Sequence, residues 1–303
     1  MYDDISLVFL RQTGYHCINE RVGGSEMTDY RRSSVHCHSR FCDGKNTLEE
    51  MTEAAWRQGL QTIGFTGHSH TPCDLSYCMN PERTKQYQEK TADLKQQYEG
   101  RLDILCGLEW DLFSDTSPRE FDYFIGSVHY LHGPKTGKYY AVDCRKEDLT
   151  ACMSEEFDGD GISMAEYYFW QVEQAAKKKP DILGHFDLIK KLNGNKDFFD
   201  ENDLRYREAA LGTLEKVIRY CNLLEINTGA ISRGYRNDLY PDDFLLKRWC
   251  ELGGDVIITA DAHRSDMLTA YYDEAAKAAE RAGFSSVIVL TKCGFEKCRI
   301  KIT

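Results

Sequence analysis

Short apolar segments alternate with longer helical patterns along most of this chain, and this alternation restricts the fold more than any other feature. Eight segments have the length and composition of buried strands: 34–39, 62–66, 103–108, 123–129, 181–185, 223–227, 256–260 and 286–290. Between them lie helical patterns, one starting at a Thr47/Glu50 capping box and others at 81–98, 164–179, 201–221, 241–252 and 267–282. Strands that alternate with helices form parallel sheets, and seven or eight such units suggest a closed barrel. We therefore predict an α/β fold of the barrel type.

Histidines and acids recur at one kind of place, at or just past the ends of these segments. His36 and His38 form a His-X-His pair, and alternate residues of a strand point to the same side, so both imidazoles can bind one metal ion. Equivalent positions on other strands hold metal-binding residue types: His68, Glu109, His129, His185, Asp261 and His263. Since the carboxyl ends of barrel strands carry the active site, we predict a metal centre at that rim. The set exceeds what one four-coordinate zinc ion needs.

Several residues leave alternatives open. Asp43 either supplies a hard oxygen ligand or forms a turn before a glycine. Glu109 and Asp111 share one side of a strand, so either carboxylate fits the ligand role, and a carboxylate can bridge two metals. Three histidines lie outside the strand-end pattern, and we expect them on the N-terminal surface, behind the ligands and in a loop, respectively: His16, His70 and His132.

Composition limits the partners and the compartment. The formal net charge of −11 argues against nucleic acid but not against a small phosphate ester, because metal ions reverse the charge locally. The twelve cysteines include no Cys-X-X-Cys pair, and no secretory signal is visible, so we expect reduced thiols in the cytoplasm. No stretch approaches the roughly 18 apolar residues that cross a membrane, so we expect no membrane partner. No feature of the sequence indicates the oligomeric state.

Two segments do not follow the alternation. Residues 1–30 have mixed polarity and no sustained period, which predicts an N-terminal extension ahead of a barrel domain at 31–303. Residues 131–162 are rich in Gly, Lys and Asp and are predicted to form a loop insertion.

Separated motifs between about residues 33 and 265 carry a family resemblance. They resemble, in order, those of the PHP (polymerase and histidinol phosphatase) family, and their wording is closest to the histidinol-phosphatase branch: VHCHSRFCDGKNTLEEM, IGFTGHSHTP, GLEWD, FDYFIGSVH, GHFDLIKKLN, LEINT and ITADAH. The resemblance implies a distorted seven-stranded, TIM-like β/α barrel with a trinuclear metal centre at its carboxyl rim. Gly67 departs from the pattern, since relatives often place an acid before the histidine, and segment 131–162 has no match.

The resemblance also implies a ligand set. By motif, nine side chains would bind three metals: His36, His38, Glu109 and Asp261 the first, Glu109, His129 and His185 the second, and Asp43, His68 and His263 the third. Two to three divalent ions are expected as cofactors. Imidazole and carboxylate ligands suit zinc, manganese and iron alike.

A function follows from the same resemblance. It implies a metal-dependent phosphomonoesterase that hydrolyses L-histidinol phosphate to L-histidinol and phosphate in histidine biosynthesis, with another small ester, such as a nucleotide or sugar phosphate, as the alternative. A hydroxide that bridges two metals would attack phosphorus, because metal binding lowers the pKa of water from ~15.7 to about 7. Glu109 would bridge the metals, and Asp261 or His263 would assist the leaving alkoxide. Arginines would bind the phosphate, and three follow the later motifs: Arg233, Arg236 and Arg264.

Overall fold

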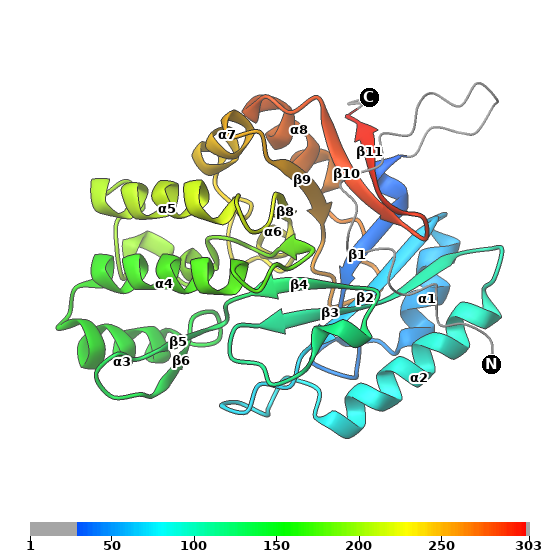
Figure 1. Cartoon of the computed structure of the whole chain (residues 1–303), viewed down its shortest axis with the longest axis horizontal. Helices are drawn as coiled ribbons and strands as arrows, with labels where there is room; N and C mark the ends of the chain where they lie inside the picture. The colour runs from blue at the N-terminus through cyan, green and yellow to red at the C-terminus, as the bar shows by residue number, and fades with distance from the viewer. Residues whose placement is uncertain (1–28, 301–303) are drawn as a thin grey trace.

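A curled, mostly parallel sheet forms the centre of residues 29–300, the part of the chain that the structure, a computed structural model, describes (Figure 1). Its strands, in spatial order, are β1 Ser33–Cys37, β2 Thr62–His68, β3 Asp103–Asp111, β4 Tyr123–Ser127, β7 Ile182–Leu183, β8 Leu223–Asn227, β9 Asp255–Thr259, β10 Ser286–Thr291 and β11 Gly294–Arg299. Neighbours pair in parallel up to β10, and β11 pairs antiparallel with β10. The predicted α/β class is confirmed.

The edges of this sheet meet at the carboxyl ends of its strands. His38 N donates to Ala262 O at 2.8 Å, and Ala262 N donates to His36 O at 2.9 Å, so the chain after β9 pairs with β1 through a parallel bridge at Cys37. Strand β10 pairs with β9 only at Ile257–Ile288. Seven strands, β1 to β4 and β7 to β9, therefore form the ring at the rim, while β10 pairs with β9 away from this rim. This arrangement agrees with the distorted seven-stranded barrel that the family resemblance implies.

Apolar side chains fill two places, the inside of the curled sheet and the layer between the sheet and the helices. The inner cluster includes Val35, Ile125, Ile182, Ile257 and Ile288. The outer layer is covered by helices around the sheet (Figure 1): α1 Leu48–Arg57, α2 Pro81–Gln97, α4 Gly161–Ala176, α5 Leu204–Val217, α7 Asp243–Glu251 and α8 Tyr272–Ala282. A packed interior of this kind is typical of a β/α barrel, in which the site lies at one end rather than in a central pore.

Helix α1 begins at the expected capping box. Glu50 N donates to Thr47 Oγ1 at 3.2 Å, and Thr47 N donates to the Glu50 carboxylate at 2.9 Å. The reciprocal bonds satisfy two of the backbone donors that a helix start leaves free. Leu48 and Met51 on the first turns are fully buried against the sheet, so the cap fixes the helix that follows the first ligand-bearing loop.

Segment 131–162 is not the loop that we expected from its composition. It contains a hairpin of β5 Tyr130–His132 and β6 Tyr139–Ala141, followed by helix α3 Lys146–Phe157. Strands of three residues carry too little alternation to be recognised, and Lys146 and the acids on α3 obscure its buried Leu149 and Cys152. Strand β11 was not predicted either, because its apolar and charged residues alternate over a short exposed edge. The insertion is therefore an ordered unit beside β4.

Helices α7 and α8 begin later than the sequence patterns predict. Tyr271, at φ 60°, lies directly ahead of α8, and residues 268–271 form turns before the helix starts at Tyr272. Asn227 N donates to Tyr240 O at 2.7 Å, which holds the chain extended up to Pro241, and α7 starts after Asp242. The predicted N-terminal extension, residues 1–30, lies outside the described residues except for its last two, and so does His16.

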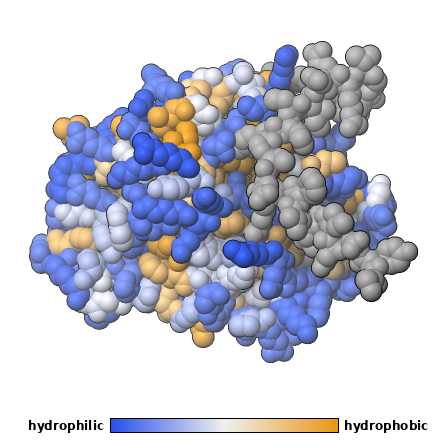
Figure 2. All heavy atoms as spheres, viewed as in Figure 1, coloured by the Kyte–Doolittle hydropathy of each residue, from blue (hydrophilic) through white to orange (hydrophobic). Residues whose placement is uncertain are grey.

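The face of the molecule in Figure 2 is mostly hydrophilic, with hydrophobic residues scattered across it. Among residues 29–300, no helix has both the length and the apolar character needed to cross a membrane.

Candidate metal centre

The strand ends bring the predicted ligands to one rim of the barrel. His36 lies in β1 and His38 just after it, while β2 ends at His68 and β3 carries Glu109. The remaining predicted ligands lie in loops that follow strand ends: Asp43, His129, His185, Asp261 and His263. All nine side chains are buried except those of Asp43 and His263, which are partly exposed. The parallel direction of the strands is what collects residues so distant in sequence.

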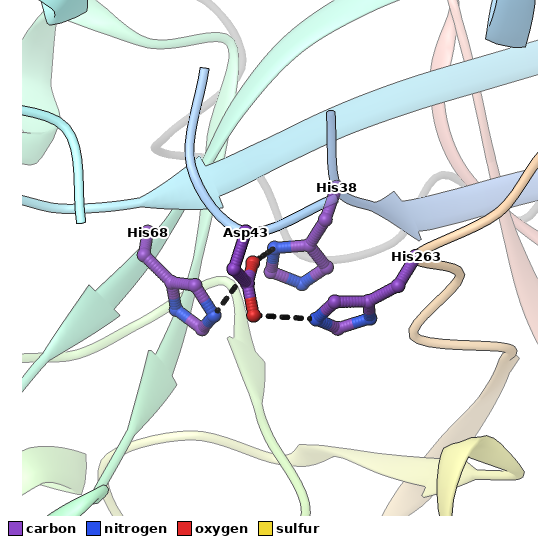
Figure 3. Close-up of side chains that lie close together, drawn as sticks. All are labelled: His38, Asp43, His68 and His263. Carbon is purple, nitrogen blue, oxygen red and sulfur yellow. Dashed lines mark hydrogen bonds and ion pairs between the residues drawn. The ribbon is translucent and has the colours of Figure 1, made fainter. Parts of the chain in front are cut away.

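Three histidines surround the carboxylate of Asp43 and form with it one group of four residues (Figure 3). Asp43 Oδ1 lies 3.6 Å from His38 Nδ1 and 3.6 Å from His68 Nε2, and Asp43 Oδ2 lies 3.0 Å from His263 Nε2. One ligand atom from each of the four lies within 4.8 Å of all the others. Three imidazoles and a carboxylate at such separations can hold one divalent ion. The sequence left Asp43 as either an oxygen ligand or a turn residue, and this geometry agrees with the ligand.

Glu109 lies between five imidazoles. Its Oε2 is 3.3 Å from the Nε2 atoms of both His36 and His38 and 3.0 Å from His68 Nδ1. Its Oε1 is 3.2 Å from His129 Nε2 and 2.8 Å from His185 Nε2. Each oxygen therefore faces a different set of histidines, which is the arrangement that a carboxylate bridging two metals requires.

The spatial groups do not coincide with the three-metal assignment by motif. His38 groups with Asp43, His68 and His263 as well as with His36 and Asp261. His68 also groups with Glu109 and His129. His185 enters no group of three among the described residues and contacts the centre through Glu109. The arrangement supports one continuous centre, within which the division of ligands among individual metals stays a prediction.

Buried ligand atoms without hydrogen-bond partners show that the site fits metal ions. Four such atoms in the described part of the chain belong to predicted ligands: His36 Nε2, His38 Nε2, Asp43 Oδ1 and Glu109 Oε2. Leaving a buried polar atom unpaired costs about 1–3 kcal/mol, so four in one place call for a partner that the protein alone does not supply. Lone pairs of imidazole and carboxylate directed at one small region are what a divalent cation would satisfy.

The pKa shifts of three predicted ligands agree with this fit. Burial, together with His263 and His68, lowers the pKa of His38 to about 3, so its imidazole is neutral and has a lone pair to donate. Burial opposes ionisation of Glu109, but His68, His36 and His129 hold the pKa of this carboxyl well below its usual range. Arg233 and His36 do the same for Asp261 against the effect of burial. The acids are therefore ionised at neutral pH. For His36 and His129, burial opposes the charged form, but carboxylates led by Glu225 and Glu109 raise the pKa of both imidazoles, so each must release a proton when a metal binds.

Carboxylates behind the ligands fix the orientation of the imidazoles. Glu225, fully buried in β8, accepts from His36 Nδ1 at 2.5 Å and from His185 N at 2.6 Å. Asp111 Oδ2 accepts from His129 N at 2.9 Å and lies 3.2 Å from His129 Nδ1. Such partners select the tautomer of a ligating histidine. Asp111 therefore supports His129, whereas Glu109 faces the centre.

Glu225 was missed by the sequence reasoning. The signal for it is an acid between Leu224 and Ile226 in an otherwise apolar strand, because an acid is rarely fully buried unless it is paired. The other two histidines lie off the centre. His70 Nδ1 is 2.7 Å from Asp115 Oδ1, and His132 packs against Tyr139 in the β5–β6 hairpin.

A cavity of about 550 Å³ opens over the centre, and the three predicted arginines differ in their relation to it. Arg233 lines the cavity and donates to Asp261 Oδ2 at 2.9 Å, with its other nitrogen 3.2 Å from His263 Nδ1. Arg264 also lines it but pairs with Asp266 at the surface. Arg236 is not among the lining residues, because its guanidinium is bound by Glu201 and Asp238. Lys191, which the sequence did not single out, is a further cation of the lining.

A parallel β/α barrel with imidazoles and carboxylates gathered at its carboxyl rim belongs to the class of metal-binding barrel proteins. The family model of the PHP domain matches residues 34–229, and the chain belongs to this family.

Relatives with known names cover most of the chain. It is 26% identical to the probable histidinol-phosphatase of Schizosaccharomyces pombe over 283 residues, 86% of this chain and 89% of that protein. It is 26% identical to the histidinol-phosphatase of Bacillus subtilis over 258 residues, 76% of this chain and 92% of that protein. The histidinol phosphate phosphatase of Lactococcus lactis, solved as a complex with zinc, L-histidinol and phosphate, has a similar fold, with a TM-score of 0.64, 20% identity and coverage of 88% of this chain and 99% of that one.

Proposed function

We propose that this protein is a metal-dependent phosphomonoesterase that hydrolyses L-histidinol phosphate to L-histidinol and phosphate. The observation that carries the proposal is the convergence of nine ligand-type side chains, four with unpaired buried atoms, beneath a cavity that also contains Arg233. The names of relatives that span most of the chain support the choice of substrate. The Lactococcus structure, with L-histidinol and phosphate bound to a similar fold, supports it as well.

The nine predicted ligands would hold two to three divalent ions. When bound, such ions would supply Lewis acidity toward the phosphate oxygens and a hydroxide at neutral pH. Zinc is the metal of the Lactococcus relative, and manganese or iron would suit the same donors. The three carboxylates of the set, Asp43, Glu109 and Asp261, bring fewer negative charges than two divalent ions bring positive ones, so the loaded centre would attract a phosphate dianion.

The residues of the chain would divide the remaining tasks. Glu225 and Asp111 hold imidazoles in fixed tautomers. Arg233, beside Asp261 and His263, would donate to a phosphate oxygen in the cavity. A phosphate there would place the leaving alkoxide next to the same two side chains. Asp261 is ionised and has no proton to give, so we assign protonation of the alkoxide to His263. We propose a cytoplasmic location from the cysteines, because those in the described part of the chain are free thiols, as expected for a protein of the cytoplasm.

Phosphate release from a panel of esters tests the proposed function. Purified protein loaded with zinc or manganese is expected to cleave L-histidinol phosphate with a higher kcat/KM than nucleotide or sugar monophosphates. A clear preference for one of the other esters would replace the proposed substrate. Fewer than two metals per chain together with no hydrolysis of any ester would refute the enzymatic role itself.

A further inference from the structure

The cavity above the metal centre has two walls of opposite character. Arg233, Lys45 and Arg264 lie on the wall that surrounds Asp261 and His263. The other wall adjoins His68 and His129 and presents two acids, two phenol rings and a lysine paired with one of the acids: Asp74, Asp143, Tyr77, Tyr130 and Lys191. Tyr77 packs edge-on against His68 at 4.7 Å between ring centroids, so this wall directly adjoins the predicted ligands. A phosphate suits the first wall, and an organic cation suits the second.

The β5–β6 hairpin positions the acidic wall. The hairpin leaves the barrel directly after His129 and returns with Val142 N donating to His129 O at 2.9 Å. Tyr130 and Asp143 are therefore held at the two feet of the hairpin, next to a predicted metal ligand. Tyr130 also donates to Asp74 Oδ2 at 2.9 Å, which joins the hairpin to the loop after β2.

Asp143 is the acid of this wall with acceptor capacity to spare. Its Oδ2 accepts from Lys191 Nζ at 2.8 Å, and no described residue donates to its Oδ1. Asp74, by contrast, already accepts from Ser76 N on one oxygen and from Tyr130 on the other. Burial opposes ionisation of Asp143, but the Lys191 ammonium, 2.8 Å away, holds the pKa of this carboxyl below its usual range, so it is charged at neutral pH.

Lys191 engages only one oxygen of this carboxylate and leaves the other able to accept a hydrogen bond. Lys191 Nζ lies 4.6 Å from the centroid of the Tyr235 ring and is almost fully buried, whereas the Asp143 side chain is 26% exposed. The lysine, which lines the same cavity, therefore fixes the orientation of the carboxylate through Oδ2 and leaves Oδ1 without a donor among the described residues. The pair resembles a built receptor site more than a surface ion pair.

We infer that Asp143 is a specificity-determining residue that binds the ammonium group of a cationic phosphate ester. The inference rests on the proposed function and deepens it, since in L-histidinol phosphate the ammonium is on the carbon next to the ester carbon. With the phosphate held by the predicted metal ligands and Arg233, that group would lie in the cavity beside the wall formed by the hairpin. Tyr77 and Tyr130 line the rest of the wall, which the imidazole ring of the substrate would contact.

A substrate comparison tests the inference. Asp143→Asn removes the charge at constant size, and the measured quantity is the ratio of kcat/KM for L-histidinol phosphate to kcat/KM for p-nitrophenyl phosphate, which has no ammonium. The ratio is expected to fall about 10- to 100-fold, the usual loss for a charge-assisted hydrogen bond. Asp143→Glu, which keeps the charge, is expected to recover part of it. Asp158→Asn, in the same insertion but exposed and paired only with Lys135, is the matched control and should keep the ratio.

The outcomes separate this inference from the proposed function. If the wild-type protein cleaves L-histidinol phosphate and Asp143→Asn leaves the ratio unchanged, the inference is wrong and the function stands. If both esters lose activity equally, Asp143 acts on the phosphate through Lys191, which also overturns the inference. If the wild-type protein does not cleave L-histidinol phosphate, the proposed function fails first and the inference falls with it. Circular dichroism and melting of each variant exclude misfolding as the cause of a loss.

Discussion

Glu225→Gln is expected to weaken metal binding although Glu225 is not a predicted ligand. A carboxylate only accepts hydrogen bonds, so His36 Nδ1, 2.5 Å away, must carry a proton. The proton on Nδ1 leaves Nε2 with its lone pair, and Nε2 is one of the unpaired buried atoms. His185 N and Thr259 Oγ1 also donate to Glu225, so the carboxylate is fully used by its neighbours.

The substitution reverses this tautomer choice. The backbone N–H of His185 can only donate, so the glutamine oxygen would stay beside it. The glutamine NH₂ would then face His36 Nδ1. To accept from this NH₂, His36 must move its proton to Nε2, where it blocks the lone pair that faces Glu109. Changes of this kind behind a metal ligand cost about 10- to 100-fold in affinity, or about 1.4–2.8 kcal/mol. If His36 keeps its tautomer, its Nδ1–H and the glutamine N–H face each other in a buried place. The free energy of unfolding then falls by about 1–3 kcal/mol instead.

Metal content after dialysis, with competition against a chelator of known affinity, measures the metal affinity. Urea unfolding measures the free energy of unfolding. Glu156→Gln is the matched control, since Glu156 is also a buried acid that accepts from Lys135 N and Tyr140, but in the hairpin insertion away from the ligands. The control should lose stability and keep its metal affinity. Unchanged metal affinity and unchanged stability in Glu225→Gln would refute the reasoning about the tautomer.

Three further predictions concern the bridge, the metal and a helix cap. Glu109→Gln should lower phosphate release more than 100-fold because both oxygens face histidines, whereas His70→Ala should cost less than about fivefold, and equal losses would contradict the ligand set. Dialysis against a chelator should abolish activity and lower Tm, with both restored by added zinc or manganese; activity that survives metal-free would count against the centre. Asp160, whose pKa is lowered to about 2 by its bonds to Ser163, caps α4, so Asp160→Ala should cost about 1 kcal/mol at pH 7. The pKa of Asp160 is lower in the folded than in the unfolded chain, so the difference in free energy of unfolding between wild type and variant should be complete above about pH 4 and shrink toward pH 2. Denaturant titrations measure this difference, and a difference that stays constant with pH would argue against the role of the Asp160 charge.

Much of the barrel was accessible from sequence because its strands are buried. Segments such as 256–260 and 286–290 are almost entirely apolar on both faces, and such runs separated by helical patterns leave few arrangements other than a parallel sheet. The placement of ligands after strand ends followed from the same pattern, since parallel strands collect their carboxyl ends at one rim. Which ligands meet did not follow, because the pairing of His38 with Asp43 and of Glu109 with five histidines depends on loop paths and on the curl of the sheet.

The residues that sequence did not supply share a physical reason. Glu225 and Lys191 lie inside two of the family motifs, LEINT and GHFDLIKKLN, but their roles come from partners 189 and 48 positions away, His36 and Asp143. Arg236 looked suitable for phosphate because of its place after β8, but nearby acids bind its guanidinium away from the cavity. The hairpin was hidden because its register is held by tertiary contacts such as Gln171 Nε2 to Tyr130 O. Such long-range contacts leave no periodic signal.

The bridge at Cys37 and Ala262 joins two parts of the chain that are synthesised far apart in time. Asp43 and His263 are 220 positions apart, so the first ligands leave the ribosome long before the last. Contacts across such separations form late, since closing a longer loop costs more chain entropy before any contact rewards it. Metal retention would then report that β9 has joined β1. A chain that stops before residue 262 would lack both Ala262, which pairs with β1, and His263, so such a fragment is expected to be apo as well as open.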